Sequence, residues 1–213
     1  MQRKIFGIGA IALTLSLAAC SSSRMVQGPP RLDLRQYGRV GMLDVTTQPG
    51  NTLGTEANRA FVAAIQTAQP GVPVLELGNE SQVLRDVGAF LLTPETLRAI
   101  GKKHGVETLL VGVLDTKEVR PKVAVGSGLS TLKAKAELEG SLVMKMYDTQ
   151  SGATIWSSSA TDRQTLAAVS VSKTGGVRGG GSSDVGGAKS ALVRNLVDRT
   201  TTDFRPTWIR VQE

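Results

Sequence analysis

The sequence predicts an α/β fold in which one compact domain holds a mixed β-sheet flanked by helices. Along residues 37–213, strand-like segments alternate with helix-like segments. The first have apolar residues at every second position, and the second have apolar residues at helical spacing. The order is strand, helix, strand, two helices, strand, a pair of long strands and a final helix. Removing 19 N-terminal residues from 213 leaves 194, which is enough for one substantial domain.

The first 19 residues have the features of a secretory signal peptide. Arg3 and Lys4 make the start positive, and residues 5–19 are almost wholly apolar or small. This run of about 15 residues is shorter than the roughly 20 that a helix needs to cross a bilayer. It therefore predicts a lipoprotein signal peptide over residues 1–19 and not a membrane span.

Cys20, the only cysteine, follows this run. The residues Leu17-Ala18-Ala19-Cys20 resemble the bacterial lipobox, which implies that the Cys20 thiol is lipidated and that cleavage leaves it as the first residue. A catalytic thiol would instead need a base within hydrogen-bond reach, and the chain has one histidine. Residue 21 is serine and not aspartate, and in this respect the sequence resembles lipoproteins that are sorted to the outer membrane. We therefore expect anchoring in the cell envelope, at the outer membrane facing the periplasm.

Residues 20–36 are expected to form the lipidated cysteine and a flexible linker. The stretch Ser21–Pro30 is small, polar and ends in proline, which is typical of a tether. The net charge of +7 falls to +5 (23 minus 18) when Arg3 and Lys4 are removed. The basic residues are scattered and few aromatic residues accompany them, so the composition does not favour binding to nucleic acid.

The first part of the domain is expected to alternate strands and helices. Residues 39–45 and 72–78 predict strands. Between them, Thr55 is expected to cap a helix that ends before Pro70. Ser81 is expected to cap a short helix that Gly88 ends. The apolar side of the first helix has the spacing of one helix face and consists of Ala57, Phe61, Ala64, Ile65 and Ala68.

The residues Thr93-Pro94-Glu95 predict a further helix start, because they combine a capping hydroxyl, a first-turn proline and a carboxylate. This helix is expected to end at Lys102-Lys103-His104-Gly105, with cations near its negative end and a glycine suited to the left-handed cap. His104 is therefore expected to have a capping or solvated role. A metal site would need further histidine or cysteine ligands, so neither a metal nor a cofactor is expected.

Three strands are expected next. Residues 106–119 contain a continuous apolar core, which predicts a central strand. After a break at Pro121 and at residues 126–128, residues 134–148 alternate cleanly. A turn at residues 148–152, in which Gly152 supplies a positive φ, leads into residues 153–162 and predicts a hairpin. One face of the middle strand is expected to consist of Ala136, Leu138, Leu142, Met144 and Met146.

A glycine-rich stretch at residues 174–187 precedes the last predicted helix, which runs from about Ala188 to Asp203. Glycines before a helix can present N–H groups to phosphate. Ala188 lies between Gly187 and Lys189, however, so the stretch does not fit G-x-x-x-x-G-K-[ST]. We expect a flexible surface loop. The alternatives are a nucleotide site, which is least favoured, and a loop that contacts a partner or another copy through Gly175, Gly176, Arg178, Gly179 and Gly180.

Three segments resemble a known superfamily: "GRVGMLDV", "GKKHGVETLLVGVLD" and "LVMKMYDTQSGATIWSSSATD". They are similar to the envelope lipoproteins that include the curli secretion channel CsgG and the penicillin-binding protein activator LpoB. The corresponding residues are His104-Gly105-Val106 through Gly112, Tyr147-Asp148 with Ser151-Gly152, and Trp156. The likeness covers residues 37–165 and implies an anticodon-binding-like α/β domain without a known active site in these segments.

No arrangement of residues predicts an enzyme. Glu137 and Glu139 are spaced like paired acids, but a solvated strand face explains them more simply. The serines at residues 157–159 lack a G-x-S-x-G elbow. Phe204, Trp208 and Ile209 are expected to pack on the sheet, although an exposed aromatic tail would suit a partner.

The expected function is therefore a lipid-anchored, non-enzymatic assembly or regulatory factor that binds an envelope protein or its own copies. The alternative is a subunit of an oligomeric outer-membrane secretion or surface-assembly channel, with residues 119–135 and 163–188 as membrane-inserting hairpins. Both stretches lack Trp, Tyr and Phe, whereas membrane strands carry aromatic girdles. The channel is accordingly the less favoured interpretation.

Overall fold

The computed structural model describes residues 23–125, 131–172, 177–179 and 185–212, with side chains in 24–117, 137–166 and 186–211. The chain divides into two units. Residues 29–207 form the main unit, and the described parts of residues 1–28 and 208–213 form the smaller one. The predicted α/β class, with a mixed sheet flanked by helices, is confirmed in the main unit.

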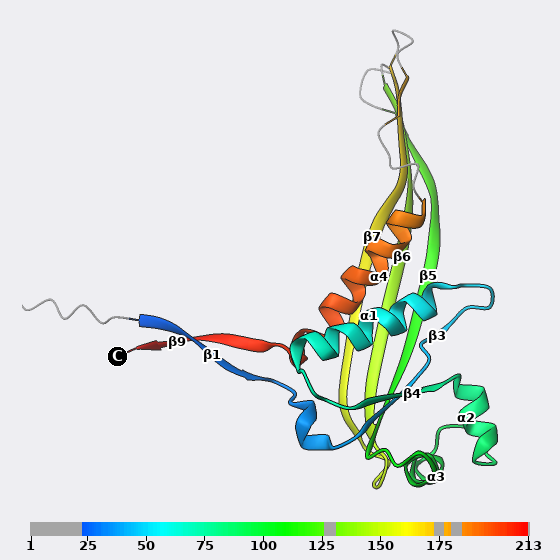
Figure 1. The fold of residues 1–213 in the computed structure, drawn as a ribbon. Coiled ribbons are helices and arrows are strands. Elements are labelled where there is room, and N and C mark those ends of the chain that lie inside the picture. Colours follow the sequence, from blue (N-terminus) through cyan, green and yellow to red (C-terminus); the bar gives the residue numbers. More distant parts are fainter. Residues whose placement is uncertain (1–22, 126–130, 173–176, 180–184, 213) are drawn as a thin grey trace, which may run out of the picture. The chain divides into compact units, whose positions relative to one another are not determined.

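The main unit is built on a seven-stranded sheet (Figure 1). The order is β4-β2-β5-β6-β7-β8, with β3 beside β5. β2 runs parallel to β4 and β5, and β3 is also parallel to β5, whereas β5, β6, β7 and β8 form antiparallel pairs. The strands are β2 (Val40–Leu43), β3 (Thr46–Thr47), β4 (Val74–Gly78), β5 (Thr108–Val125), β6 (Thr131–Asp148), β7 (Thr154–Ser172) and β8 (Val177–Gly179).

Helices cover both faces of this sheet. α1 (Leu53–Ala68) and α4 (Val185–Thr200) share one core with it, and α2 (Glu80–Asp86) and α3 (Pro94–His104) share the other. Side chains alternate along a strand, so Met42 belongs to the first core and Leu43 to the second. Two short 3-10 helices, η1 (Leu34–Tyr37) and η2 (Thr202–Phe204), complete the unit. Within the described ranges, no helix combines the length and apolarity needed to cross a membrane.

Three aromatic side chains lie at the centre of the first core. Phe204 is fully buried and packs against Trp156 with ring centroids 4.9 Å apart, and against Phe61 at 5.9 Å in an edge-to-face arrangement. The Trp156 indole N–H donates to Asp203 Oδ2 over 3.1 Å, so its polar group is satisfied. The expectation that Phe204 packs on the sheet is confirmed.

Gln69 joins three segments that are distant in sequence. It is buried just beyond the end of α1. Its Oε1 accepts a hydrogen bond from the Leu34 N–H over 2.7 Å, and its Nε2 donates to the carbonyls of Leu32 at 2.6 Å and Phe204 at 2.9 Å. One amide therefore satisfies three backbone groups that would otherwise be buried without partners.

Of the three capping residues predicted from the sequence, one is confirmed. Thr93 caps α3, because its Oγ1 accepts a hydrogen bond from Thr96 N, and Gly105 ends the helix with a φ of 64°. The predicted caps of the other two helices are wrong. α1 begins at Leu53, whose N–H donates to Asn51 Oδ1, and Asn79 caps α2 by accepting from Ser81 N. Asn51 and Asn79 accept hydrogen bonds from the N–H groups at the two helix starts, so Thr55 and Ser81 lie inside the helices.

The three central strands are longer than predicted. β5 continues through the expected break at Pro121 and pairs with β6 on both sides of it. The register of this pair shifts between Val119 and Lys122, so the missing N–H of Pro121 falls at an irregularity where a ladder hydrogen bond is not required. β7 likewise extends to Ser172.

Part of the predicted linker is strand. β1 (Ser23–Pro30) pairs with β9 (Pro206–Gln212) in a separate two-stranded sheet, which we call the terminal ribbon. Leu32 and Leu34, also within the predicted linker, are buried in the first core. The expectation that Trp208 and Ile209 pack on the main sheet is wrong: they lie in β9 and are 63% and 49% exposed. The chain leaves the core at Arg205, directly after η2, and pairs with β1 instead.

Candidate functional site: a groove between two helices

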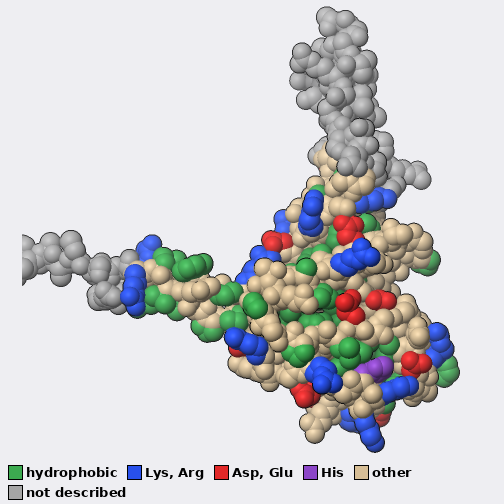
Figure 2. Space-filling model, in the orientation of Figure 1, with side chains coloured by type: hydrophobic (Ala, Val, Ile, Leu, Met, Phe, Trp, Pro, Cys, Tyr) green, Lys and Arg blue, Asp and Glu red, His purple; other side chains and the backbone are tan. Residues whose placement is uncertain are grey.

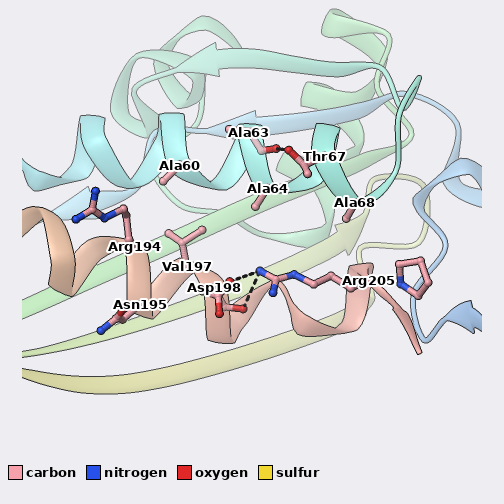
Figure 3. Close-up of a pocket in the computed structure, with 11 residues that line it drawn as sticks. Ala60, Ala63, Ala64, Thr67, Ala68, Arg194, Asn195, Val197, Asp198 and Arg205 are labelled. Carbon is pink, nitrogen blue, oxygen red and sulfur yellow. Dashed lines mark hydrogen bonds and ion pairs between the residues drawn. The ribbon is translucent and has the colours of Figure 1, made fainter. Parts of the chain in front are cut away.

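A groove runs between α1 and α4 and has a volume of about 740 Å³. In Figure 3 the side chains of Ala60, Ala64 and Ala68 lie on the side of α1 that faces α4. All of its residues belong to the main unit. The lining consists of Ala60, Ala63, Ala64, Thr67, Ala68, Arg194, Asn195, Val197, Asp198, Arg205 and Pro206.

The α1 side of the groove is small and almost wholly apolar. Its alanines and Thr67 recur at intervals of three and four residues, which places them on one side of the helix. The Thr67 hydroxyl donates to the Ala63 carbonyl over 2.7 Å, so its polar group is already satisfied. From Ala60 to Ala68 the stripe extends about 12 Å, or slightly more than two turns. A partner can therefore approach the α1 backbone closely along this length.

The stripe adds to the sequence interpretation of α1. Ala57, Phe61 and Ile65 are buried as expected, and Ala64 and Ala68 are partly buried against the same core while they also line the groove. The small side chains leave space between the helices that larger residues would fill. The signal for the groove was present in the sequence as the alanine spacing, but that spacing alone does not distinguish core from surface.

The α4 side carries the charges. Arg205 forms an ion pair with Asp198 and also donates to the Asp198 carbonyl over 3.3 Å. Arg194 is exposed on the same wall and makes no ion pair with any described side chain. The wall therefore holds one balanced pair and one uncompensated positive charge, which favours an anionic group on whatever enters the groove.

A partly buried carboxylate on β7, Asp162, connects α4 to the sheet. Asp162 Oδ2 accepts hydrogen bonds from Asn195 over 2.8 Å and from Gln164 over 2.9 Å, and Arg199 Nη2 lies 3.6 Å from Asp162 Oδ1. Burial raises the pKa of Asp162, but the hydrogen bonds from Asn195 and Gln164 outweigh it and hold that pKa below its ordinary value. Asn195 lines the groove, so this contact connects the groove wall to the sheet.

Catalytic chemistry is not apparent in the described side chains. None of them form a group of three or more His, Cys, Asp or Glu residues that could hold a metal ion. His104 lies in the last turn of α3, as predicted, and its Nε2 is buried without a hydrogen bond to any described group. The groove itself contains no histidine or cysteine. It offers contact area and charge to a ligand.

The two glutamates singled out from the sequence both form ion pairs with one arginine. Arg163 Nη2 lies 3.1 Å from Glu139 Oε2, and Arg163 Nη1 lies 3.9 Å from Glu137 Oε2. The arginine is more than half exposed, so this is a solvent-screened ion cluster on the strand surface. The interpretation of a solvated strand face therefore accounts for both carboxylates.

Most of the predicted site residues lie outside the described residues: Cys20, Gly175, Gly176 and Gly180. Arg178 and Gly179 belong to β8, where they pair with Ser170 and Val169 of β7. α4 begins at Val185, three residues before the expected start. Parts of the glycine-rich stretch are thus strand and helix, and its contact with a partner stays a prediction.

No family model matches the chain, and no curated protein matches it either. Solved structures that are similar include the PelC dodecamer from Paraburkholderia phytofirmans, with 13% identity, a TM-score of 0.44, and coverage of 88% of this chain and 99% of that chain. The LpoB C-terminal domain from Salmonella enterica is 17% identical, with a TM-score of 0.37 and coverage of 59% and 83%. Lipoprotein GNA1162 from Neisseria meningitidis is 15% identical, with a TM-score of 0.36 and coverage of 74% and 96%.

These likenesses include LpoB, which the sequence resemblance had named, and a second lipoprotein. A relation to CsgG stays a prediction. Because every TM-score above is below 0.5, neither the family nor the activity of this chain follows from them. The groove is therefore interpreted from its own residues.

Proposed function

We propose that the chain is a lipid-anchored envelope protein that binds a protein partner in the groove between α1 and α4 and catalyses no reaction. The observation that carries this proposal is the pairing of an apolar alanine floor with an uncompensated arginine on the wall. The signal-like N-terminus and the lipobox-like residues before Cys20 support the anchor, at the outer membrane facing the periplasm.

The groove best suits a helical segment of the partner. Grooves between helices commonly receive a third helix, which presents side chains spaced by three and four residues. A floor of about 12 Å would accommodate roughly two to three turns. The occupant would carry small or medium apolar residues on one side and a carboxylate placed to meet Arg194. The alanines on the α1 side of the groove would supply contact area, and the charge of Arg194 would orient the partner.

Anchoring would add to the affinity without adding a contact. A lipid on Cys20 confines the groove to the membrane surface, so a partner in the same layer meets it at a raised effective concentration. A modest groove affinity would then be sufficient for assembly or regulation. A small groove lined by alanines could therefore be sufficient for binding when the protein is anchored.

The proposal is tested by photo-crosslinking in cells. A photoreactive amino acid at position 63, which is exposed and lines the groove, is expected to capture one envelope protein, identified by mass spectrometry. The same probe at position 66 is the matched control, since Gln66 is exposed on α1 but does not line the groove. Equal capture from both positions, or none from either, would contradict the groove.

Charge reversal tests the role assigned to Arg194. Arg194→Glu is expected to lower the yield of the position-63 adduct by roughly fivefold or more, because a rim charge would then repel the partner's carboxylate. Arg59→Glu makes the same charge change at an exposed residue of α1 outside the groove and is expected to leave the yield unchanged. Similar losses in both variants would mean that only net charge matters.

The second candidate, a subunit of an oligomeric outer-membrane channel, has one observation in its favour. β5, β6 and β7 are 18, 18 and 19 residues long and pair side by side, with β8 beside β7. A strand that spans a membrane needs about 9 to 11 residues, and each of these three strands exceeds that length over its whole extent.

Detergent-solubilised full-length protein distinguishes the two candidates. A channel subunit is expected to form a large closed ring that is visible by electron microscopy and has a defined mass by light scattering. A monomer at micromolar concentration would remove the channel candidate. Partner capture at position 63 by a monomer would favour the first proposal.

A further inference from the structure

The connection between α2 and α3 exposes two large apolar side chains that are adjacent in sequence. Phe90 is 90% exposed and Leu91 is 73% exposed, and we call this pair the apolar tip. Residues 79–105 are all described, and no other large apolar side chain among them is exposed. The connection itself, residues 87–93, contains no charged residue. Isolated exposed apolar residues are normal, whereas a pair that projects this far from an uncharged connection indicates a surface that receives it.

Hydrogen bonds and packing fix the base of the apolar tip. The Ala89 N–H donates to the Leu84 carbonyl over 2.9 Å, and the Gly88 N–H donates to the Arg85 carbonyl over 3.0 Å. With Gly88 at a φ of 71°, this is the Schellman end of α2. Ala89 and Leu92, which flank the tip, pack against the second core. The tip is therefore presented by a fixed turn, so little conformational entropy would be lost when it enters another surface.

The charges at the base of the tip give a small positive excess. Arg85 and Asp86 end α2, and Lys103 Nζ donates to the Asp86 carbonyl over 2.5 Å, which brings the end of α3 beside them. Two cations and one carboxylate therefore border the uncharged connection. The other charged side chains of the two helices are Glu80 at the far end of α2, Glu95 and Arg98, which form an ion pair at 3.8 Å, and Lys102, which lines a separate pocket with Glu107 and Asp148. Figure 2 shows basic side chains, with acidic ones between them, over the part of the main unit where Figure 1 draws α2 and α3.

Size and chemistry select a lipid surface as the occupant. A specific protein interface buries about 800 Å² on each partner and involves roughly 20 to 30 residues, whereas the tip offers two side chains, with no other exposed large apolar residue on α2 or α3. A contact between two copies through the tip would have the same small area. A bilayer needs no complementary pocket, because its hydrocarbon takes up apolar side chains and its phosphates lie outside the hydrocarbon, where cations behind the tip would meet them.

We propose that the apolar tip inserts into the lipid surface at which the chain is anchored, with Arg85 and Lys103 beside the phosphates. This inference rests on the lipid anchor of the proposed function and adds a direct contact between the main unit and the bilayer. Nine peptide steps separate Cys20 from Pro29, where the main unit begins, so their Cα atoms are at most about 32 Å apart. An anchored main unit is therefore held close to the surface that the tip would enter.

The test uses the full lipidated chain reconstituted into vesicles of phosphatidylethanolamine and phosphatidylglycerol. Cys20 is the only cysteine and lipidation blocks its thiol, so Leu91→Cys accepts a single fluorophore next to an intact Phe90. Lipids with a nitroxide on the acyl chain near the headgroup are expected to quench this label at least twofold relative to the same vesicles without nitroxide. The matched control is the same label on Gln66→Cys, an exposed position of α1 on the opposite face of the sheet. Its emission is expected to stay unchanged.

A second pair of variants tests whether the tip itself inserts. Phe90→Asp in the chain labelled at position 91 is expected to lose at least half of the quenching, because a carboxylate opposes transfer into hydrocarbon. Val113→Asp makes the same change at a 50% exposed apolar residue of β5 and is expected to leave the quenching unchanged. Both positions are exposed, so we expect both variants to fold.

Flotation separates failure of the anchor from failure of this inference. A chain that does not float with the vesicles would contradict the anchor. A chain that floats while the label at position 91 is quenched no more than the label at position 66 would overturn the tip contact and leave the anchor intact. Equal quenching before and after Phe90→Asp would also overturn it. Dimer formation in sedimentation that shields position 91 from aqueous iodide, without nitroxide quenching, would overturn it in favour of a second copy.

Discussion

At the scale of single residues, the buried Gln69 side chain joins three segments of the main unit. Its amide satisfies backbone groups of Leu32, Leu34 and Phe204. Gln69→Leu keeps the approximate volume but leaves these groups buried and unpaired, so we expect a loss of about 2 to 4 kcal/mol in the free energy of unfolding. Urea denaturation followed by circular dichroism measures this loss. Gln66→Leu, at an exposed position of the same helix, is expected to change it by less than about 0.5 kcal/mol.

Asp162 predicts how stability depends on pH. Its pKa is held below the ordinary value, mainly by hydrogen bonds from Asn195 and Gln164 that outweigh the effect of burial. The unfolded chain therefore binds a proton more readily than the folded one. The contribution of Asp162 is complete above about pH 4 and is lost as the pH falls below that value, toward the folded pKa.

The variant Asp162→Asn tests this dependence. We expect it to cost about 1 kcal/mol at pH 7 and to narrow its difference from the unmodified chain as the pH falls from about 4 to 2. Denaturant midpoints measured across this range check the prediction. A difference that stays constant with pH would mean that the charge of Asp162 does not contribute.

At the scale of elements, the hairpin turn between β6 and β7 packs directly against the start of α3. Gly152 has a φ of 77°, and a Cβ built on it would lie 2.7 Å from the Pro94 Cα. Gly152→Ala therefore combines backbone strain with a clash, and we expect a loss of about 2 to 4 kcal/mol. Gly50 is the control: its φ is 82°, and a Cβ there would meet nothing within 4 Å. Thermal denaturation of Gly50→Ala reports the strain alone, which we expect to be about 1 kcal/mol.

Local signals predicted elements well where one residue type decides the geometry. The cap at Thr93, the left-handed Gly105 and the turn glycine at Gly152 are such cases, and all three were predicted correctly. The start of α1 was missed because Asn51 and Thr55 are both competent caps, and only the folded loop places Asn51 against Leu53. The lengths of β5 and β7 were missed because pairing with β6 sustains them beyond the sequence pattern.

Sequence patterns were less informative about surfaces. Ala64 packs against the core and also lines the groove, and only the packing of α4 reveals the second contact. The sequence likewise predicted a core position for Trp208, but β9 pairs with β1 and Trp208 is exposed. Gln69 could not be identified at all, because its three partners are joined only in the folded chain. Tertiary contacts, not local propensity, determine each of these features.

At the scale of the whole molecule, two proposed features form one account. A lipidated Cys20 would hold the chain at the membrane, and the groove between α1 and α4 would bind a partner helix. Confinement to one membrane surface would raise the effective concentration of the groove for a partner in the same layer, as expected for an assembly or regulatory factor.

The proposed function depends on the anchor at Cys20, so mass spectrometry of the N-terminal tryptic peptide tests the account most directly. Protein purified from a diderm bacterial host is expected to yield the peptide of residues 20–24, "CSSSR", with a diacylglyceryl group on the Cys20 sulfur and an acylated N-terminus. Recovery of residues 5–24 as one peptide with an unmodified Cys20 would contradict the account.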